Sequence, residues 1–188
     1  MEAIEAAAIS QARSGDPEGF RVLVELHSRA VFRLAYRMTG NEQDAEDTVQ
    51  ETFLRAWRQL RRFDGRSRFG TWLHAITANC AVDLLRRRSR QQKAEEAVEP
   101  SQLAAQAAAS PSPEREAISR QAGRRVTAAL SSLSPAERAA FLLRHFEGVS
   151  IEEISKLVGG NNGAVRHRVF RAVQKLRRAL EPAMSVTP

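Results

Sequence analysis

The chain has 188 residues, 43% of them hydrophobic and 27% charged, which suits one ordinary domain or two small ones and excludes disorder throughout. Its 29 basic and 22 acidic residues give a net charge of +7, and all but three of the basic residues are arginine, which fits either a polyanionic partner or a genome-wide compositional bias. The single cysteine, Cys80, excludes an internal disulfide and a multi-cysteine zinc site.

Membrane insertion is not expected from the hydropathy pattern. No apolar run approaches the roughly 20 residues that a membrane-spanning helix needs. The first 16 residues carry acids where a signal peptide would have a basic flank. The sequence therefore predicts a cytoplasmic protein.

Helix signals dominate the first half of the chain, and no stretch shows sustained period-two alternation, so we predict an all-α fold. Asp16-Pro17 begins a helix that runs toward Met38, and Gly40 ends it. Asn41 caps a second helix, whose apolar residues recur at spacings of three and four as far as Leu60.

A third long helix follows the turn-like segment at Phe63-Asp64-Gly65. Its apolar positions run from Phe69 to Leu84, and it ends in the basic run 86–88. These three helices are expected to form one small helical bundle.

The segment after this bundle differs in composition. Residues 91–113 contain three prolines, runs of alanine and glutamine, and no aromatic residue, so they cannot bury enough surface to offset their ordering entropy. We therefore predict two helical domains, 1–92 and 117–188, joined by a flexible linker at 93–116.

The second domain has the helix start and stop signals of a helix-turn-helix. Ser134-Pro-Ala-Glu137 and Ser150-Ile-Glu-Glu153 both fit the capping box, and each should begin a helix. Glycines close both helices, and Asn161 is placed to cap a final helix that runs to about Leu180. A short helix, a glycine turn and a longer basic helix are typical of DNA-binding proteins.

The final helix divides into two faces at about 100° per residue. Val165, Ala172 and Leu176 fall on an apolar face, whereas small and basic residues from Ala164 to Arg178 fall on the other side. Such a face suits a major groove. The alternative is that this is a solvated basic face on an ordinary amphipathic helix. The capped helix and the Gly159-Gly160 turn that precede it favour DNA binding over that alternative.

The third helix carries a second candidate surface. Trp72, Asn79 and Asp83 lie on one stripe with Arg86, after the arginine-rich loop 62–68. Aromatic rings stack on unpaired bases, amides and carboxylates read base edges, and arginines hold phosphates. The alternative is that Trp72 packs in the core while the arginines are solvated.

The outer face of the second helix is acidic and so unsuited to DNA. Its acids, from Glu42 to Glu51, are consistent with solvated surface or with a docking face for a basic partner.

Enzyme signatures are absent from the sequence. There is no Walker loop, no GxGxxG after a strand and no HExxH, and the four histidines form no close ligand set. We expect no catalytic residues, no metal and no cofactor.

Three segments, in the right order and spacing, resemble bacterial RNA polymerase sigma factors of the sigma-seventy family, in the extracytoplasmic-function (ECF) group. Residues 47–60 are similar to the segment that binds core polymerase, and Phe69-Gly-Thr-Trp72 with Asn79 and Asp83 is similar to the helix that melts and reads the minus-ten element. Residues 133–172 resemble the minus-thirty-five helix-turn-helix.

The resemblance implies roles for three sets of residues, with the helix-turn-helix at Ile151 to Phe170. The set implied to bind polymerase is Asp47, Gln50, Glu51, Phe53, Leu54 and Trp57. The set implied to read minus-ten DNA is Phe63, Arg66, Ser67, Arg68, Phe69, Trp72, Asn79, Asp83 and Arg86. The set implied to read minus-thirty-five DNA is Ala164, Arg166, His167, Arg168 and Arg171.

The implied function is promoter-specific transcription initiation. The implied partners are core RNA polymerase, promoter DNA as duplex upstream and as single strand at minus ten, and an anti-sigma factor. Two other classes stay open on the residues alone: a helix-turn-helix regulator that binds an operator without polymerase, and a purely protein-binding helical adaptor.

Overall fold

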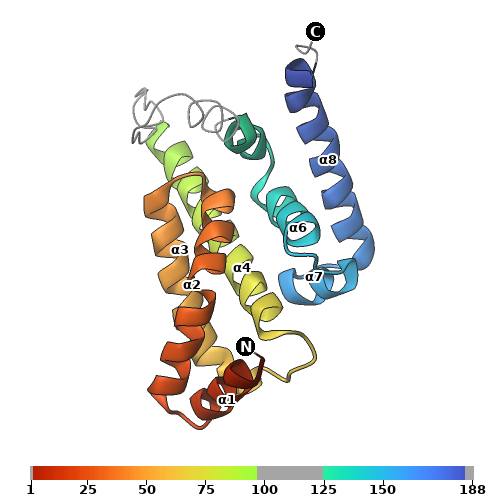
Figure 1. Ribbon diagram of the computed structural model, residues 1–188. Helices are drawn as coiled ribbons and strands as arrows, with labels where there is room; N and C mark the ends of the chain where they lie inside the picture. The colour runs from red at the N-terminus through yellow and green to blue at the C-terminus, as the bar shows by residue number, and fades with distance from the viewer. Residues whose placement is uncertain (1, 97–124, 185–188) are drawn as a thin grey trace, which may run out of the picture.

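The computed structural model describes residues 2–96 and 125–184, and every regular element in these two stretches is helical (Figure 1). The predicted all-α fold is confirmed. The predicted linker lies outside the described residues except at 93–96. Within the described stretches, none of the helices combines the length and the apolar character that a membrane crossing requires.

The chain begins with α1 (Glu2–Arg13) and α2 (Pro17–Thr39). Asp16 caps α2 by accepting the Glu18 N–H at 2.9 Å, as predicted. Gly40, at φ +83°, ends the helix by donating its N–H to Tyr36 O. Helix α1 was not predicted, because its inward side is made of small residues that give no apolar periodicity.

The next elements are α3 (Glu42–Gln59), the short 3₁₀ helix η1 (Leu60–Arg62) and α4 (Phe69–Glu96). The predicted cap at Asn41 is confirmed, since its side chain accepts the Asp44 N–H at 2.9 Å. Helix α4 continues beyond the basic run where we expected it to end.

The later stretch contains a helical segment at 125–131, then α6 (Pro135–His145), α7 (Ile151–Val158) and α8 (Asn162–Met184). Both predicted capping boxes are present, at Ser134/Glu137 and Ser150/Glu153. Helix α8 runs four residues past the predicted end. We call residues 2–96 the first lobe and residues 125–184 the second lobe.

Helix α4 lies on the side of the first lobe that faces the second lobe (Figure 1). One side of it, with Leu73 and Ile76, belongs to the core that α2 and α3 share. Another side, with Ala78, Ala81 and Val82, belongs to a second core that α6, α7 and α8 complete. The lobes are therefore packed together through α4 and are not separate bodies in this structure.

Gly19 makes the packing of α1 on α2 possible. A Cβ atom at Gly19 would lie 2.6 Å from Gln11 Cβ, 2.7 Å from Ala12 N and 2.8 Å from Ala8 O. Two of these atoms are backbone, so the neighbours cannot yield without moving α1.

We predict that Gly19→Ala destabilises the protein by about 1–2 kcal/mol in urea unfolding, because overpacking of about 1–3 kcal/mol exceeds the gain in helix propensity. Gly70→Ala is the matched control. It also replaces a helical glycine, but its Cβ would meet only His27 side-chain atoms at 3.5 and 3.6 Å, so its stability should be unchanged or slightly higher. Equal behaviour of the two variants would contradict the close packing of α1.

Candidate functional site

Helix α8 presents a buried side and a basic side. Val165 and Ala172 are fully buried and Leu176 is nearly so, which turns the opposite side outward. Arg166, His167 and Arg171 are exposed there, and we call these three residues the α8 basic face. Its geometry agrees with the two faces expected from the sequence.

The turn before α8 is held by side-chain hydrogen bonds. Asn161 Oδ1 accepts the Ala164 N–H at 2.7 Å, so the predicted cap is confirmed. Ser155 in α7 lies 2.6 Å from Asn162 Oδ1, which joins α7 to the start of α8. The two helices of the helix-turn-helix are thereby fixed relative to each other.

Two cations of α8 are engaged within the second lobe. Arg168 is half-buried and donates to Gly159 O at 3.5 Å, across the turn. Lys175 lies 2.7 Å from Glu137 Oε2, the carboxylate of the first capping box. Ala164, at the start of α8, is half-buried. Arg168 thus reaches across the turn in this structure, and its role as a DNA contact stays a prediction.

The six residues of α3 that were implied to bind polymerase point in different directions. Asp47, Gln50, Leu54 and Trp57 are exposed on one side, and we call these four residues the α3 stripe. Leu54 is 52% exposed and Trp57 38%, which is unusual for large apolar groups. Phe53 instead turns inward, with its ring 6.3 Å from that of Phe20.

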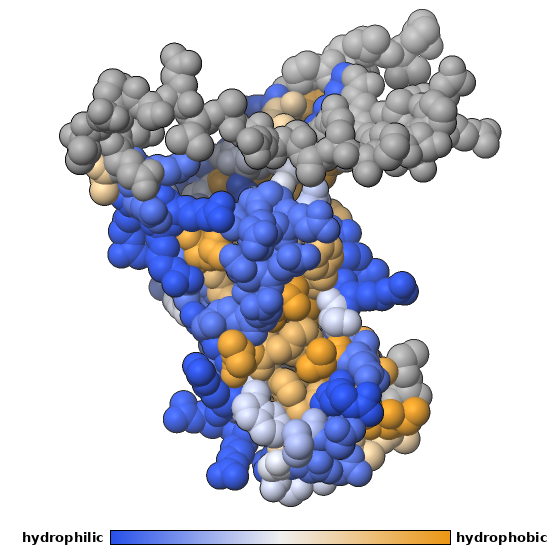
Figure 2. Space-filling view, turned by 90° about the vertical axis from the view of Figure 1, so that its left-hand side faces the viewer, coloured by the Kyte–Doolittle hydropathy of each residue, from blue (hydrophilic) through white to orange (hydrophobic). Residues whose placement is uncertain are grey.

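An apolar groove lies beside the α3 stripe. It has a volume of about 480 Å³ and is lined by Ser28, Arg29, Phe32 and Arg33 of α2 and Val49 of α3. Figure 2 shows this side of the molecule, where hydrophobic residues gather in a band surrounded by hydrophilic ones. A surface of this kind suits a protein partner that offers apolar side chains within a polar rim.

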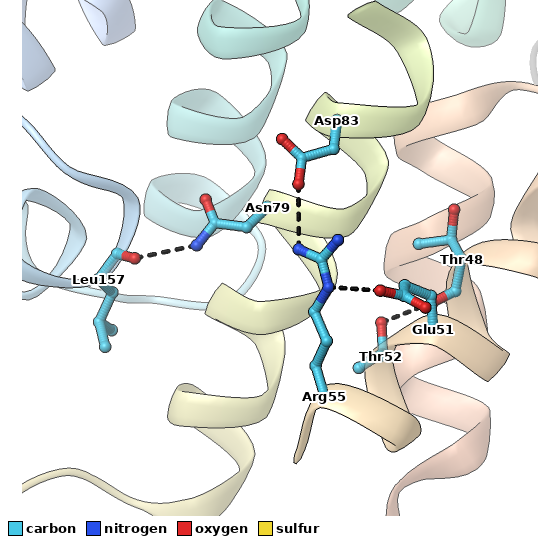
Figure 3. Close-up of polar contacts among 7 residues, drawn as sticks. All are labelled: Thr48, Glu51, Thr52, Arg55, Asn79, Asp83 and Leu157. Carbon is cyan, nitrogen blue, oxygen red and sulfur yellow. Dashed lines mark hydrogen bonds and ion pairs between the residues drawn. The ribbon is translucent and has the colours of Figure 1, made fainter. Parts of the chain in front are cut away.

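Glu51 is not part of the stripe, because it pairs with Arg55 at 2.6 Å (Figure 3). Arg55 also reaches Asp83 of α4 at 3.0 Å, so this arginine links α3 to α4. The hydrogen bond that Arg55 donates to the Glu51 carboxylate raises the pKa of Arg55. Sequence spacing did not reveal Arg55, whose partner in α4 is 28 positions away.

Three aromatic residues of the minus-ten set pack on one another. Phe63 and Phe69 are buried, with ring centroids 5.5 Å apart, and Trp72 lies 5.2 and 5.4 Å from them. Phe63 and Phe69 thus support the half-buried Trp72 and present no ring to solvent. The adjoining Arg66 and Arg68 are exposed, and Ser67 is half-buried.

The remaining residues of the set lie along α4. Asn79 donates from Nδ2 to the Leu157 carbonyl of α7 at 3.0 Å (Figure 3). Asp83 accepts from Arg55, and Arg86 is exposed at the next turn. The amide that was predicted to read a base is therefore occupied by the second lobe.

A polar cluster between the lobes was not predicted. His74 Nδ1 lies 3.0 Å from Glu147 Oε2, Arg37 lies 4.0 Å from Glu147 Oε1, and Arg37 also stands over the Phe146 ring at 4.4 Å. The hydrogen bond from His74 holds the pKa of Glu147 below its usual value, and the Arg37 charge adds to this. These residues lie far apart in the sequence, so no local pattern could reveal them.

Arg138 completes the contact between the lobes. It is 6% exposed and donates from Nη1 to the Met38 carbonyl near the end of α2. Its Nε has no partner, and no acidic side chain pairs with Arg138 among the described residues. Burial alone lowers the pKa of this guanidinium.

No group of three or more histidine, cysteine or acidic side chains within the described stretches could hold a metal ion. Cys80 is buried, and burial raises its pKa to about 11, so its thiol stays protonated at neutral pH.

Comparison with protein families gives two matches. Residues 23–91 match the model described as Sigma-70 region 2, and residues 123–176 match the model described as Sigma-70, region 4. The first covers α2 to α4, and the second covers the helix-turn-helix.

Curated relatives span most of the chain. An ECF sigma factor, SigW of Bacillus subtilis, is 28% identical over 187 residues, covering 96% of this chain and 98% of the relative. The sigma-E factor of Haemophilus influenzae is 31% identical over 182 residues, covering 95% and 96%. SigE of Mycolicibacterium smegmatis is 42% identical over 165 residues, covering 88% of this chain and 63% of the longer relative.

The chain is also similar in fold to solved structures of complexes. CnrH in complex with the cytosolic domain of CnrY matches with a TM-score of 0.66 and 28% identity, covering 95% of this chain and 98% of CnrH. The sigma factor RpoE of Bartonella quintana, in complex with the anti-sigma factor NepR, matches with a TM-score of 0.62 and 26% identity, covering 86% and 96%.

Proposed function

Because this chain belongs to the ECF group of sigma-70 RNA polymerase sigma factors, we propose that it directs promoter-specific initiation through three separate surfaces. The α3 stripe binds core polymerase, the loop 62–68 and α4 read the minus-ten element, and the α8 basic face reads the minus-thirty-five element. The observation that carries this assignment is the α8 basic face, which the buried Val165 and Ala172 on the opposite side turn outward.

The α3 stripe has the chemistry of a protein interface. Exposed Leu54 and Trp57 give an apolar centre, and Asp47 and Gln50 give a polar rim. Glu51 and Phe53 act indirectly in this proposal, because one holds Arg55 and the other packs on Phe20.

The minus-ten surface would hold unpaired bases. Trp72 offers a ring supported by Phe63 and Phe69, Asn79 and Asp83 offer groups that read base edges, and Arg66, Arg68 and Arg86 with Ser67 hold phosphates. Removing a base from the stack costs a few kcal/mol, and only a matching sequence recovers that energy through contacts.

The chain supplies no catalytic group in this scheme, since polymerase carries out the chemistry. The boundaries we propose for the two domains stay at 1–92 and 117–188. The structures of CnrH and of the Bartonella RpoE hold partner proteins, one of them named an anti-sigma factor, so we also propose that a cytosolic anti-sigma protein binds this chain.

The proposed function is tested by reconstituted transcription with purified core polymerase on a promoter library. We expect transcripts that begin downstream of one shared bipartite motif. A helix-turn-helix regulator that acts without polymerase would bind duplex DNA in the same assay but would start no transcripts. That outcome would contradict the proposed function.

The α3 stripe is tested by Leu54→Ala and Trp57→Ala. Central apolar residues of interfaces commonly contribute more than 1 kcal/mol, so each variant should weaken polymerase binding about fivefold to thirtyfold. Ile4→Ala is the matched control, because Ile4 is 59% exposed on α1 and outside the stripe. Fluorescence-detected titration of core polymerase measures the effect, and affinities equal to that of the control would exclude the stripe.

The α8 basic face is tested by Arg171→Ala, with Arg177→Ala as control. Both arginines are exposed on α8, but Arg177 lies near the end of the helix and away from the turn. A side chain that reads a base contributes about 1–3 kcal/mol of discrimination, whereas a phosphate contact weakens binding equally for all sequences. We expect only Arg171→Ala to relax upstream-element preference in competition binding to duplex DNA, and unchanged preference would mean that Arg171 reads no base.

A further inference from the structure

Arg55 joins a residue of the polymerase set to a residue of the minus-ten set. Its Nε donates to Glu51 Oε1 at 2.6 Å, one turn back on α3, and its Nη1 donates to Asp83 Oδ2 on α4 at 3.0 Å (Figure 3). The sequence implied roles for Glu51 and Asp83 and none for Arg55. This arginine therefore binds two carboxylates that belong to different proposed surfaces.

The Arg55 guanidinium is held by its own helix as well as by α4. The bond to Glu51 spans four residues along α3 and orients the planar guanidinium. The helices pack closely at this level, since Ala56 of α3 and Cys80 of α4 are buried. A planar group that is bonded at two of its nitrogens leaves little freedom to the carboxylates it binds. Asp83 is therefore fixed in direction by a residue of another helix.

Asp83 would oppose DNA binding if its charge had no partner. Its side chain is 48% exposed, and an unpaired carboxylate at this surface would repel the phosphates of a bound strand. Arg86 and Arg87 follow it on the same helix, yet within the described stretches the cation that lies within ion-pair distance of Asp83 is Arg55. Arg55 therefore supplies the opposite charge that makes an acid compatible with the minus-ten surface.

The bond to Arg55 occupies one oxygen of Asp83 and leaves the other available. Oδ1 accepts no hydrogen bond from the part of the chain that the structure describes, and it points away from Arg55 (Figure 3). An ionised carboxylate accepts hydrogen bonds and donates none. The exocyclic amino groups of unpaired cytosine and adenine donate, whereas thymine carries a carbonyl oxygen at the corresponding position, which a carboxylate repels. The free oxygen of Asp83 therefore suits an amino-bearing base.

We propose that Arg55 is a positioning residue of the minus-ten surface, which holds Asp83 so that its free oxygen accepts from the exocyclic amine of an unpaired cytosine or adenine. The inference rests on the proposed function, since it concerns how one residue of the proposed minus-ten set selects its base. Arg55 acts through Asp83 and does not touch the base. An ion pair that only joined α3 to α4 would instead affect all promoters equally, and this difference decides the experiment.

The test uses the full chain bound to core polymerase, with promoters that differ at single minus-ten positions and compete in one reaction. Competition cancels changes in polymerase affinity and in the amount of folded protein, because both affect every promoter equally. For the wild type we expect one position at which cytosine or adenine is transcribed about fivefold to tenfold better than thymine, as one hydrogen bond to a carboxylate provides. Arg55→Met should remove most of this preference and leave the preference for the upstream element unchanged.

Arg21→Met is the matched control for the loss of a bridging arginine. Arg21 also binds two carboxylates, those of Glu18 and Glu25, but both lie on its own helix, α2, and outside the three proposed surfaces. This variant should keep the wild-type base preference. Arg55→Lys keeps the positive charge but loses the planar fork that reaches both carboxylates, so it should recover part of the preference that Arg55→Met loses.

Asp83→Ala tests whether Arg55 acts through Asp83. It should lose the preference at the same position, and the double variant with Arg55→Met should lose no more, because both changes remove one contact. The proposal is overturned by a wild type that prefers thymine or no base, by an unchanged preference in Arg55→Met, or by a change at a position that Asp83→Ala leaves unaffected. A wild-type chain that starts no transcripts contradicts the proposed function itself, whereas transcripts with unchanged ratios in Arg55→Met contradict this inference alone.

Discussion

Helix α4 packs against the rest of the first lobe and against the second lobe at once, and the surroundings of the proposed minus-ten residues depend on this double contact. Its first-lobe side carries large apolar groups such as Leu73 and Ile76, whereas the side toward α6 and α7 carries Ala78 and Ala81. Small side chains let the second lobe approach closely, so α4 belongs to two cores and its polar residues fall along the boundary between them. Asn79 and Asp83 consequently meet protein partners where an isolated first lobe would expose them.

The same contact explains why the three surfaces differ in accessibility. The α3 stripe and the α8 basic face lie on the exposed sides of their helices, which the contact between the lobes leaves uncovered. The proposed minus-ten surface is built on α4, and the second lobe reaches it through Leu157 of α7. The outer sides of α3 and α8 are therefore exposed in this structure, while Asn79 and Asp83 of α4 meet protein partners.

Local features of this fold could be predicted from the sequence, and features set by long-range packing could not. The caps at Asp16, Asn41 and Ser150 involve partners two or three residues away, so their residue types suffice. The Asn79 bond reaches Leu157, 78 positions along the chain, and no periodicity encodes that pairing. The family resemblance implied Phe63 and Phe69 as base contacts, whereas in the structure burial of apolar area places both rings against Trp72.

Arg138 is a buried charge whose desolvation opposes the contact between the lobes. An interface that never opens gains from a buried carboxylate partner or from an apolar side chain in place of the guanidinium, since an unpaired buried charge opposes association. Here the guanidinium meets the Met38 carbonyl, whose helix has reached its end and needs a donor. The carbonyl recovers part of the desolvation cost of Arg138. The apolar core that the two lobes share must therefore outweigh the remainder of that cost for the lobes to pack as they do.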